Sequence, residues 1–403
     1  MNNHLDYPFD GSDILAHGKR IQRELRSDGT ARIKKRIAIL GGSTTHNIRN
    51  CLEIILLHYD IDAEFYESEY TQYWQDAMFP NEQLESFAPD IIWIHTSLRN
   101  FAEYDHFASI WQRLADTYHC PIIQNNFEYP YYRVMGNREA SHGSVYRVTE
   151  MNLHFAEYAR THDNFYILDI NWLSADYGLK EWSDPFYWHM YKYALCLDAM
   201  PYLARNAANI IKSIFGKNKK AFALDLDNTL WGGIVGDDGA EGIVVGQETS
   251  MGQVYSEFQA YIKAHKDIGV ILNVNSKNEL ANAIAGLERP DSTLKPDDFI
   301  LVKANWEPKS HNLIGMAAEL SLGADAFVFV DDNPVERDIV RQHVPGVAIP
   351  ELDKPEHYIY AIDRAGYFEV TAMTADDANR NEQYKANAER SRLQTNFTDY
   401  QDY

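Results

Sequence analysis

The chain has 403 residues, of which 45% are hydrophobic and 24% charged, a composition typical of a soluble protein with two or three globular domains. Its formal net charge of -22 opposes binding to nucleic acid, which depends on clustered lysine and arginine. No apolar run reaches the length of a membrane span and the N-terminus lacks the features of a signal peptide, so we expect a cytoplasmic protein without a membrane partner. Its three cysteines lack CxxC spacing, which argues against a disulfide framework or a zinc site.

The first part of the chain, residues 1–215, is predicted to form one α/β domain. Ile14, Ile21 and Leu25 recur at helical spacing in a charged segment, which predicts an N-terminal packing helix. Apolar runs then alternate with helical stretches. Five strands are predicted, at residues 37–40, 62–68, 90–96, 119–128 and 165–171. This alternation favours a doubly wound sheet.

A polar basic linker at residues 216–220 precedes a second α/β domain, residues 220–370. Its first strand is followed by a glycine-rich, hairpin-like insert that ends at Gly246. Five strands are predicted, at residues 221–227, 270–276, 299–305, 326–332 and 347–350, with helices between them. Residues 371–403 are polar and predict a surface helix that continues into a tail. The expected fold class is therefore α/β, with two doubly wound three-layer α/β domains.

Polar side chains follow the apolar strands of the second domain. Asp225, Asp227 and Thr229 alternate after the first strand. A buried aspartate is costly unless it is paired or bound to a cation, and ligands bind at the carboxyl ends of parallel strands. Later strand ends and helix starts carry four more such residues: Ser276, Lys309, Asp331 and Asp332. The common position of all these residues predicts a single site.

The pattern Asp-x-Asp-x-Thr after an apolar strand resembles the nucleophile motif of the haloacid dehalogenase (HAD) superfamily of aspartate-dependent phosphatases and phosphotransferases. The resemblance implies Asp225 as a nucleophile that forms an aspartyl phosphate, and Asp227 as the acid and base. It implies Mg²⁺ as cofactor, held by Asp225, the backbone carbonyl of Asp227, Asp331 and Asp332. Binding of a phosphorylated small-molecule substrate is expected from Ser276, Lys309, Thr229 and Lys277. Thr229 is also expected to orient Asp227.

Three longer stretches, LDLDNTLWGGIVGDDG, NWEPKSHNL and FVDDNPVERD, are similar to the FkbH-like branch of that superfamily. The similarity covers about residues 220–367. Members of this branch load a glyceryl group from a bisphosphorylated glycerate onto an acyl carrier protein, which implies such a carrier as a partner. The insert at residues 231–246 is then the hairpin flap of a capless, open HAD-like site. Many relatives continue into an acetyltransferase-like domain, and this sequence ends where that domain would begin.

An acyl carrier protein is acidic, as is this chain, so a basic face would be needed for docking. The tail offers four candidates for that face, with a solvated helix surface as the alternative: Arg380, Lys385, Arg390 and Arg392.

In the first domain, Gly41-Gly42-Ser43-Thr44 follows a strand and begins a helix. This resembles the serine-bearing block of SGNH-type hydrolases, a domain that precedes the phosphatase domain in longer FkbH-like relatives. The resemblance implies Ser43 as nucleophile, Asn126 as an oxyanion donor, and Asp184 and His189 as acid and base. The spacing of that pair is longer than the usual Asp-x-x-His, and Ser43 also fits a turn or helix cap. The alternative is a degenerate hydrolase fold that binds or positions a substrate or carrier.

Three functions therefore remain open. The favoured one is a Mg²⁺-dependent phosphatase or phosphotransferase acting on a small or carrier-tethered phosphorylated metabolite, such as a glyceryl phosphate. The second is an esterase that works through Ser43, with a regulatory HAD domain. The third is a non-catalytic assembly scaffold.

Overall fold

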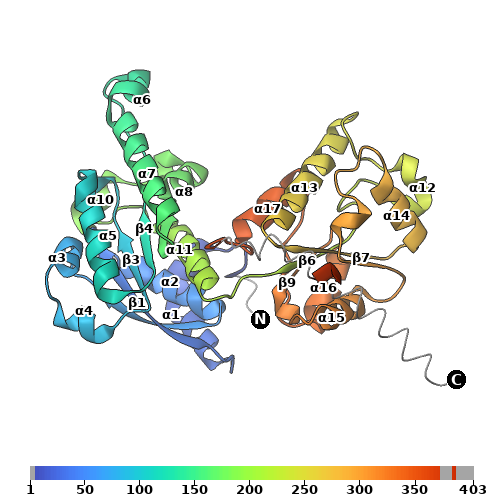
Figure 1. Cartoon of the computed structure of the whole chain (residues 1–403), viewed down its shortest axis with the longest axis horizontal. Helices are drawn as coiled ribbons and strands as arrows, with labels where there is room; N and C mark the ends of the chain where they lie inside the picture. Colours follow the sequence, from blue (N-terminus) through green and yellow to red (C-terminus); the bar gives the residue numbers. More distant parts are fainter. Residues whose placement is uncertain (1–4, 373–383, 387–403) are drawn as a thin grey trace. The chain divides into compact units, whose positions relative to one another are not determined.

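The computed structural model describes residues 5–372 and 384–386 (Figure 1). The chain divides into two compact units, an N-terminal unit of residues Phe9–Lys217 and a C-terminal unit from Asn218 onward. The segment before Phe9 belongs to the C-terminal unit, so the chain passes between the units twice. Most of the polar segment predicted as a surface helix at residues 371–403, including Arg380, Arg390 and Arg392, lies outside the described residues.

The sheet of the N-terminal unit has five parallel strands in the order β2-β1-β3-β4-β5. They are β1 (Ile33–Gly41), β2 (Ile61–Glu67), β3 (Ile91–His95), β4 (Ile122–Asn125) and β5 (Phe165–Leu168). Residues 37–40 of β1 are all fully buried. Burial of consecutive residues shows that helices cover both faces of the sheet, as parallel strands require.

Helices flank this sheet on both sides (Figure 1). Those on one side are α1 (Gly11–Ser27), α2 (His46–His58) and α11 (Met200–Ile214). Those on the other side are α3 (Tyr73–Met78), α4 (Glu82–Phe87), α5 (Tyr104–Tyr118) and α7 (Ser144–Thr161). The other α-helices described in this unit are α6 (Glu139–His142), α8 (Ile170–Tyr177), α9 (Leu179–Trp182) and α10 (Pro185–Tyr191). Ala38 and Leu40 of β1 pack with Phe107 and Trp111 of α5 in one hydrophobic core.

The sheet of the C-terminal unit has four parallel strands in the order β8-β7-β6-β9. They are β6 (Ala221–Leu224), β7 (Ile271–Ser276), β8 (Leu301–Ala304) and β9 (Phe327–Val330). Phe222 and Leu224 share a core with helices α13 (Ser250–Asp267), α14 (Leu280–Glu288) and α17 (Tyr358–Ala365). Ala221 and Ala223 share another with α15 (Lys309–Glu319) and α16 (Pro334–His343). Alternate residues of β6 thus bury opposite faces of the sheet.

The predicted α/β class with parallel sheets is confirmed. The insert at residues 231–246 differs from a hairpin, because it contains the short helix α12 (Val235–Gly242). One antiparallel bridge, Gly232 to Val244, closes its base. The backbone N–H groups of residues 237 and 238 donate hydrogen bonds to the carbonyl of Ile234, and these bonds fold the glycine-rich tip into a helical turn.

The strand predicted at residues 347–350 is reduced to a single bridge between Val328 and Ala348. Gly346 has φ of 88° and Pro350 has no N–H to donate, so this segment cannot extend a hydrogen-bonded ladder. The helix predicted from Lys277 begins later, at Leu280. The intervening residues form the loop after β7.

In the part of the chain that the structure describes, none of the helices has the apolar length that a membrane span needs. Cys51, Cys120 and Cys196 are free. Burial raises the pKa of Cys51 and of Cys120 to about 12, so neither thiol ionises near neutral pH.

Candidate active site

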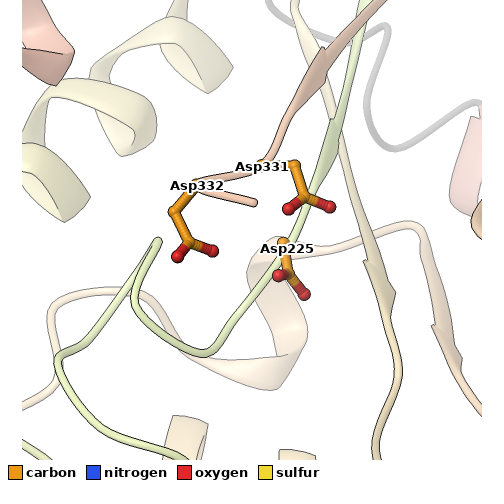
Figure 2. Close-up of side chains that lie close together, drawn as sticks. All are labelled: Asp225, Asp331 and Asp332. Carbon is orange, nitrogen blue, oxygen red and sulfur yellow. The ribbon is translucent and has the colours of Figure 1, made fainter. Parts of the chain in front are cut away.

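Three carboxylates meet at the carboxyl ends of two neighbouring strands, β6 and β9. Asp225 follows β6, and Asp331 and Asp332 follow β9, whose Val330 pairs with Leu224. Each of the three offers an oxygen atom within 4.8 Å of the others, and Figure 2 shows their carboxylates facing a common space. Asp331 is fully buried and Asp225 is only 6% exposed. The register of two parallel strands therefore assembles this group.

Lys309 supplies a buried positive charge to these carboxylates. Its Nζ lies 2.8 Å from Asp225 Oδ2 and 2.6 Å from Asp331 Oδ2, and the residue is 3% exposed. It is the first residue of α15, and its carbonyl accepts a 2.9 Å hydrogen bond from Asn275 Nδ2. The end of β7 and the start of α15 thus fix the ammonium group between two carboxylates.

One ammonium group does not balance three carboxylates in a buried site. Burial, together with the charge of Asp225, raises the pKa of Asp331 to about 7, while Lys309 opposes that rise. Burial and Asp225 also raise the pKa of Asp332. Burial alone would lower the pKa of Lys309, but Asp225 and Asp331 raise it. The site therefore holds excess negative charge that a cation would offset.

The donor atoms of Asp225, Asp331 and Asp332 are all carboxylate oxygens. Hard cations such as Mg²⁺ and Ca²⁺ prefer oxygen ligands, whereas zinc sites favour histidine and cysteine. The three carboxylates, with their excess negative charge, fit a hard divalent cation. The carboxylate of Asp227 is not part of this group, so only its backbone could take the ligand role expected from the sequence.

Asp227 is held in one orientation by three hydrogen bonds. Its Oδ1 accepts from Trp231 Nε1 at 2.8 Å and from the backbone N–H of Val235 at 3.0 Å. Its Oδ2 accepts from Asn278 Nδ2 at 2.8 Å. Trp231 and Val235 belong to the insert after β6, and Asn278 lies in the loop after β7. Both loops therefore orient this carboxylate.

The other residues predicted to bind phosphate make different contacts. Thr229, expected to orient Asp227, instead contacts Asp332: its Oγ1 accepts the Asp332 N–H at 3.1 Å and lies 3.4 Å from Oδ1. Ser276 is 1% exposed, and its Oγ accepts from Asn278 Nδ2 at 3.3 Å. Lys277, predicted to bind phosphate, has its Nζ 2.6 Å from Glu336 Oε1. Its charge is thus already paired with the carboxylate of Glu336.

Arg337 and Asn278 are site residues that the sequence motifs did not identify. The Nη1 of Arg337 donates to the carbonyls of Asp331 and Asp332, each at 2.8 Å. Asn333 adds its N–H to Asp331 Oδ1 at 2.9 Å. Arg337 lies in α16, six and five residues after the two aspartates, and no sequence signal indicated this contact. For Asn278, the one sequence feature that could have indicated a place in the site is its position two residues after Ser276.

The N-terminal candidate Ser43 is 3% exposed, and its Oγ has no hydrogen-bond partner among the residues described by the structure. Asp184 caps α10 by accepting the Phe186 N–H at 2.7 Å, and His189 is an exposed residue of that helix. No hydrogen bond in the described parts of the chain therefore links Ser43 with this pair.

Asn126, expected to be an oxyanion donor, instead donates from Nδ2 to Asp169 Oδ1 at 2.7 Å. Its Oδ1 accepts the N–H of Asn171 at 3.0 Å, so its amide joins the ends of β4 and β5. Asn100 is the amide beside the Ser43 turn, since its Nδ2 donates to the carbonyl of Gly42 at 3.0 Å. A Cβ at Gly42 would overlap the Asn100 side chain, which explains the glycine.

Comparison with known proteins places the chain among its relatives. Residues 36–212 match the family model described as FkbH, N-terminal domain. The crystal structure of the N-terminal part of protein BF1531 from Bacteroides fragilis, containing a phosphatase domain and complexed with Mg, is 32% identical with a TM-score of 0.82. The match covers 88% of this chain and 99% of that one.

A weaker likeness is to the C-terminal catalytic domain of peptidoglycan O-acetyltransferase A from Streptococcus pneumoniae, at 17% identity and a TM-score of 0.29. It covers 47% of this chain and 94% of that domain, and a likeness this weak says nothing about activity. No curated protein matches the chain. The identity and near-complete overlap with BF1531, together with the match of residues 36–212, show that the chain belongs to the FkbH-like family.

Proposed function

We propose that the chain is a Mg²⁺-dependent phosphatase or phosphotransferase of the HAD type, with its active site in the C-terminal unit. The observation that carries this proposal is the group of Asp225, Asp331 and Asp332 around the ammonium of Lys309. The phosphatase domain and Mg in the description of BF1531 support it. In domain terms, we assign residues 220–370 to a HAD-like domain and residues 1–215 to an SGNH-hydrolase-like domain.

Asp225, Asp331 and Asp332 would hold the Mg²⁺. When bound, the ion would supply positive charge that offsets the repulsion between a phosphate dianion and an attacking carboxylate. Lys309 already provides part of this charge, since its Nζ contacts Asp225 Oδ2 at 2.8 Å. Its burial keeps the ammonium poorly screened by water, which strengthens its effect on the substrate.

Asp225 is the proposed nucleophile. Its carboxylate oxygen forms a bond to phosphorus while the bond from phosphorus to the leaving oxygen breaks, which gives an aspartyl phosphate. Asp227 donates the proton that the leaving oxygen takes up, and then removes a proton from the attacking water or acceptor hydroxyl. Its three hydrogen bonds, from Trp231, Val235 and Asn278, fix the direction in which it can act. Attack by water releases phosphate and restores Asp225.

The proposed substrate is a small or carrier-tethered phosphorylated metabolite, such as a glyceryl phosphate, with an acyl carrier protein as possible acceptor. We propose that the N-terminal unit binds or positions a substrate or carrier. A second function, an esterase acting through Ser43, is less favoured because that hydroxyl is buried and has no hydrogen-bonded base among the described residues.

The test is Mg²⁺-dependent release of phosphate from p-nitrophenyl phosphate by the full chain. Asp225→Asn should abolish it, while Asp267→Asn, an exposed aspartate at the end of α13, should leave it unchanged. Full activity in Asp225→Asn would refute the proposed nucleophile. Ser43→Ala should also leave phosphate release intact, and loss of p-nitrophenyl acetate cleavage in that variant alone would establish the esterase.

The substrate is tested with a panel of metabolites that includes 1,3-bisphosphoglycerate with an acyl carrier protein. Turnover of any member that disappears in Asp225→Asn supports the proposed function. Absence of turnover across the panel and of generic phosphatase activity would favour a scaffold instead.

A further inference from the structure

A cavity of about 250 Å³ lies within the N-terminal unit. Its walls include residues 98, 99 and 101 after β3 and residues 128–132 after β4. The start of α7 and the segment from Ser183 to Ala194 complete it. In open parallel sheets, ligands bind outside the carboxyl ends of the strands, which is where the segments after β3 and β4 begin. Ser43 and Asn126 do not line this cavity, but Asp184, which the sequence suggested as a member of the hydrolase-like site, does.

Glu128 places a carboxyl group in the cavity wall although the residue is only 6% exposed. Its Oε2 accepts the backbone N–H of Leu98 at 3.2 Å, and its own backbone N–H also contributes. No side chain donates a hydrogen bond to it among the described residues. Burial raises the pKa of Glu128 to about 7, although backbone N–H groups and the charge of Arg99 favour the ionised form. A carboxylate has about four acceptor sites, so Glu128 keeps unused capacity for a ligand.

Aromatic side chains form much of the remaining wall. Tyr129, Trp188 and Tyr193 line the cavity, and the Arg99 guanidinium lies 5.2 Å from the Trp188 ring centroid. Tyr131 and Tyr132 also line it and are 53% and 58% exposed. Aromatic faces exposed beside a cavity are suited to stacking against a flat ring.

Two arginines, Arg99 and Arg147, line the same cavity and are exposed. Neither forms a salt bridge with any described residue, in a chain whose formal net charge is -22. The carboxylate of Asp184, which also lines the cavity, accepts the N–H of Phe186 at the start of α10. Arginine forms strong, directional hydrogen bonds with phosphate and carboxylate groups. The exposed side of the cavity is thus equipped to receive an anion.

We propose that this cavity binds a planar anionic small molecule whose ring donates hydrogen bonds to Glu128 and whose anionic group contacts Arg99 and Arg147. Nucleoside 5′-monophosphates with a guanine-like edge combine these features, because the ring N–H groups lie opposite the phosphate. The volume of about 250 Å³ is close to the lower limit of about 300 Å³ for typical ligand pockets, so the ring fills the cavity and the phosphate stays at its exposed side.

The first experiment measures binding to the full chain by isothermal titration calorimetry, with guanosine 5′-monophosphate as probe. Guanosine lacks the anion, ribose 5-phosphate lacks the ring, and adenosine 5′-monophosphate lacks the paired N–H donors. Each is expected to bind at least about tenfold more weakly than the probe, because the loss of one hydrogen bond to a charged group weakens affinity by about that factor. Absence of probe binding at millimolar concentration, or equal binding of ribose 5-phosphate, would overturn the proposal.

The second experiment places the probe with variants. Arg147→Ala should weaken binding of guanosine 5′-monophosphate by about tenfold and leave guanosine unaffected. Arg160→Ala removes an exposed arginine from the same helix, α7, that does not line the cavity, and should change neither affinity. Equal effects of these two substitutions would contradict the assigned anion contact.

Glu128→Gln tests the ring contact, since it should reduce the preference for guanosine over adenosine 5′-monophosphate by about tenfold. Circular dichroism of this variant checks that it folds, and Arg147→Ala tests the cavity independently because that residue is exposed. The Asp225→Asn variant should bind the probe with the same affinity as the wild type. This proposal for the cavity is therefore tested independently of the proposed phosphatase function. An unchanged preference in folded Glu128→Gln would reject Glu128 as the ring contact.

Discussion

Replacing Lys309 with methionine removes the positive charge from the carboxylate group while it keeps most of the aliphatic stem. Lys309 is 3% exposed, and its Nζ lies 2.8 Å from Asp225 Oδ2 and 2.6 Å from Asp331 Oδ2. Loss of one partner from a buried ion pair leaves an uncompensated charge and costs about 3–5 kcal/mol. We therefore expect Lys309→Met to destabilise the C-terminal unit by about that amount in metal-free buffer at pH 8.

The pH matters because the raised pKa of Asp331, about 7, means that its ionisation weakens the fold as pH rises through that value. The cost of Lys309→Met should consequently be smaller at pH 6, where Asp331 is protonated, than at pH 8. Urea unfolding monitored by fluorescence and circular dichroism gives the free energy of unfolding at each pH.

Lys303→Met is the matched control in the same unit. Lys303 Nζ lies 2.8 Å from Glu319 Oε2, but the two side chains are 31% and 19% exposed. A partly exposed pair contributes about 0–1 kcal/mol, so this substitution should have a small effect. If Lys309→Met costs no more than Lys303→Met, the buried charge balance described for the site is incorrect.

Three further predictions concern metal binding, packing and pH. Mg²⁺ at a hundred times its dissociation constant should raise the free energy of unfolding of the C-terminal unit by about 2.7 kcal/mol, as measured by urea unfolding. The same increase in the Asp331→Asn variant would contradict the assignment of Asp331 as a metal ligand. Gly286→Ala places a Cβ 2.9 Å from the Trp231 ring. Thermal unfolding should therefore show a loss of about 1–3 kcal/mol in the free energy of unfolding, although alanine favours the helix more than glycine does. A stabilised variant would mean that the ring can move freely. The pKa of Glu128 in the folded state, about 7, is higher than in the unfolded chain. The free energy of unfolding of the N-terminal unit should therefore fall by up to about 3 kcal/mol between pH 5 and 8. The same pH dependence in urea unfolding of Glu128→Gln would exclude Glu128 as the cause.

The strands were predictable because both faces of each parallel sheet are covered, so that strands become continuous apolar runs. The same logic located Asp225 and Asp331, since carboxylates directly after such runs must meet at one edge of the sheet. The strands and the carboxylates that follow them can therefore be predicted from the sequence of each segment alone.

The remaining parts of the site depend on contacts between distant segments. Nothing around Asn278 indicates that its amide reaches Asp227, 51 residues earlier. Thr229 was misjudged for a related reason, because its partner Asp332 is 103 residues away and not the neighbouring Asp227. The insert was predicted, but its helix α12 was not, because the glycines there carry neither a clear strand period nor a clear helix period. The roles of Asp184 and His189 stay predictions.

The double passage of the chain between its units has a consequence for dissecting the protein. Leu5 is 1% exposed, and Tyr7 packs against the core of the C-terminal unit, with its ring centroid 6.2 Å from that of Tyr360. A fragment that starts at Asn218 would lack this segment and expose the apolar surface beneath it. After a single protease cut in the linker at residues 216–220, the segment with Leu5 and Tyr7 would stay covalently attached to the N-terminal unit, and only its packing would hold the C-terminal fragment. We therefore expect separate expression of the C-terminal unit to need the segment with Leu5 and Tyr7, grafted back or supplied as a peptide.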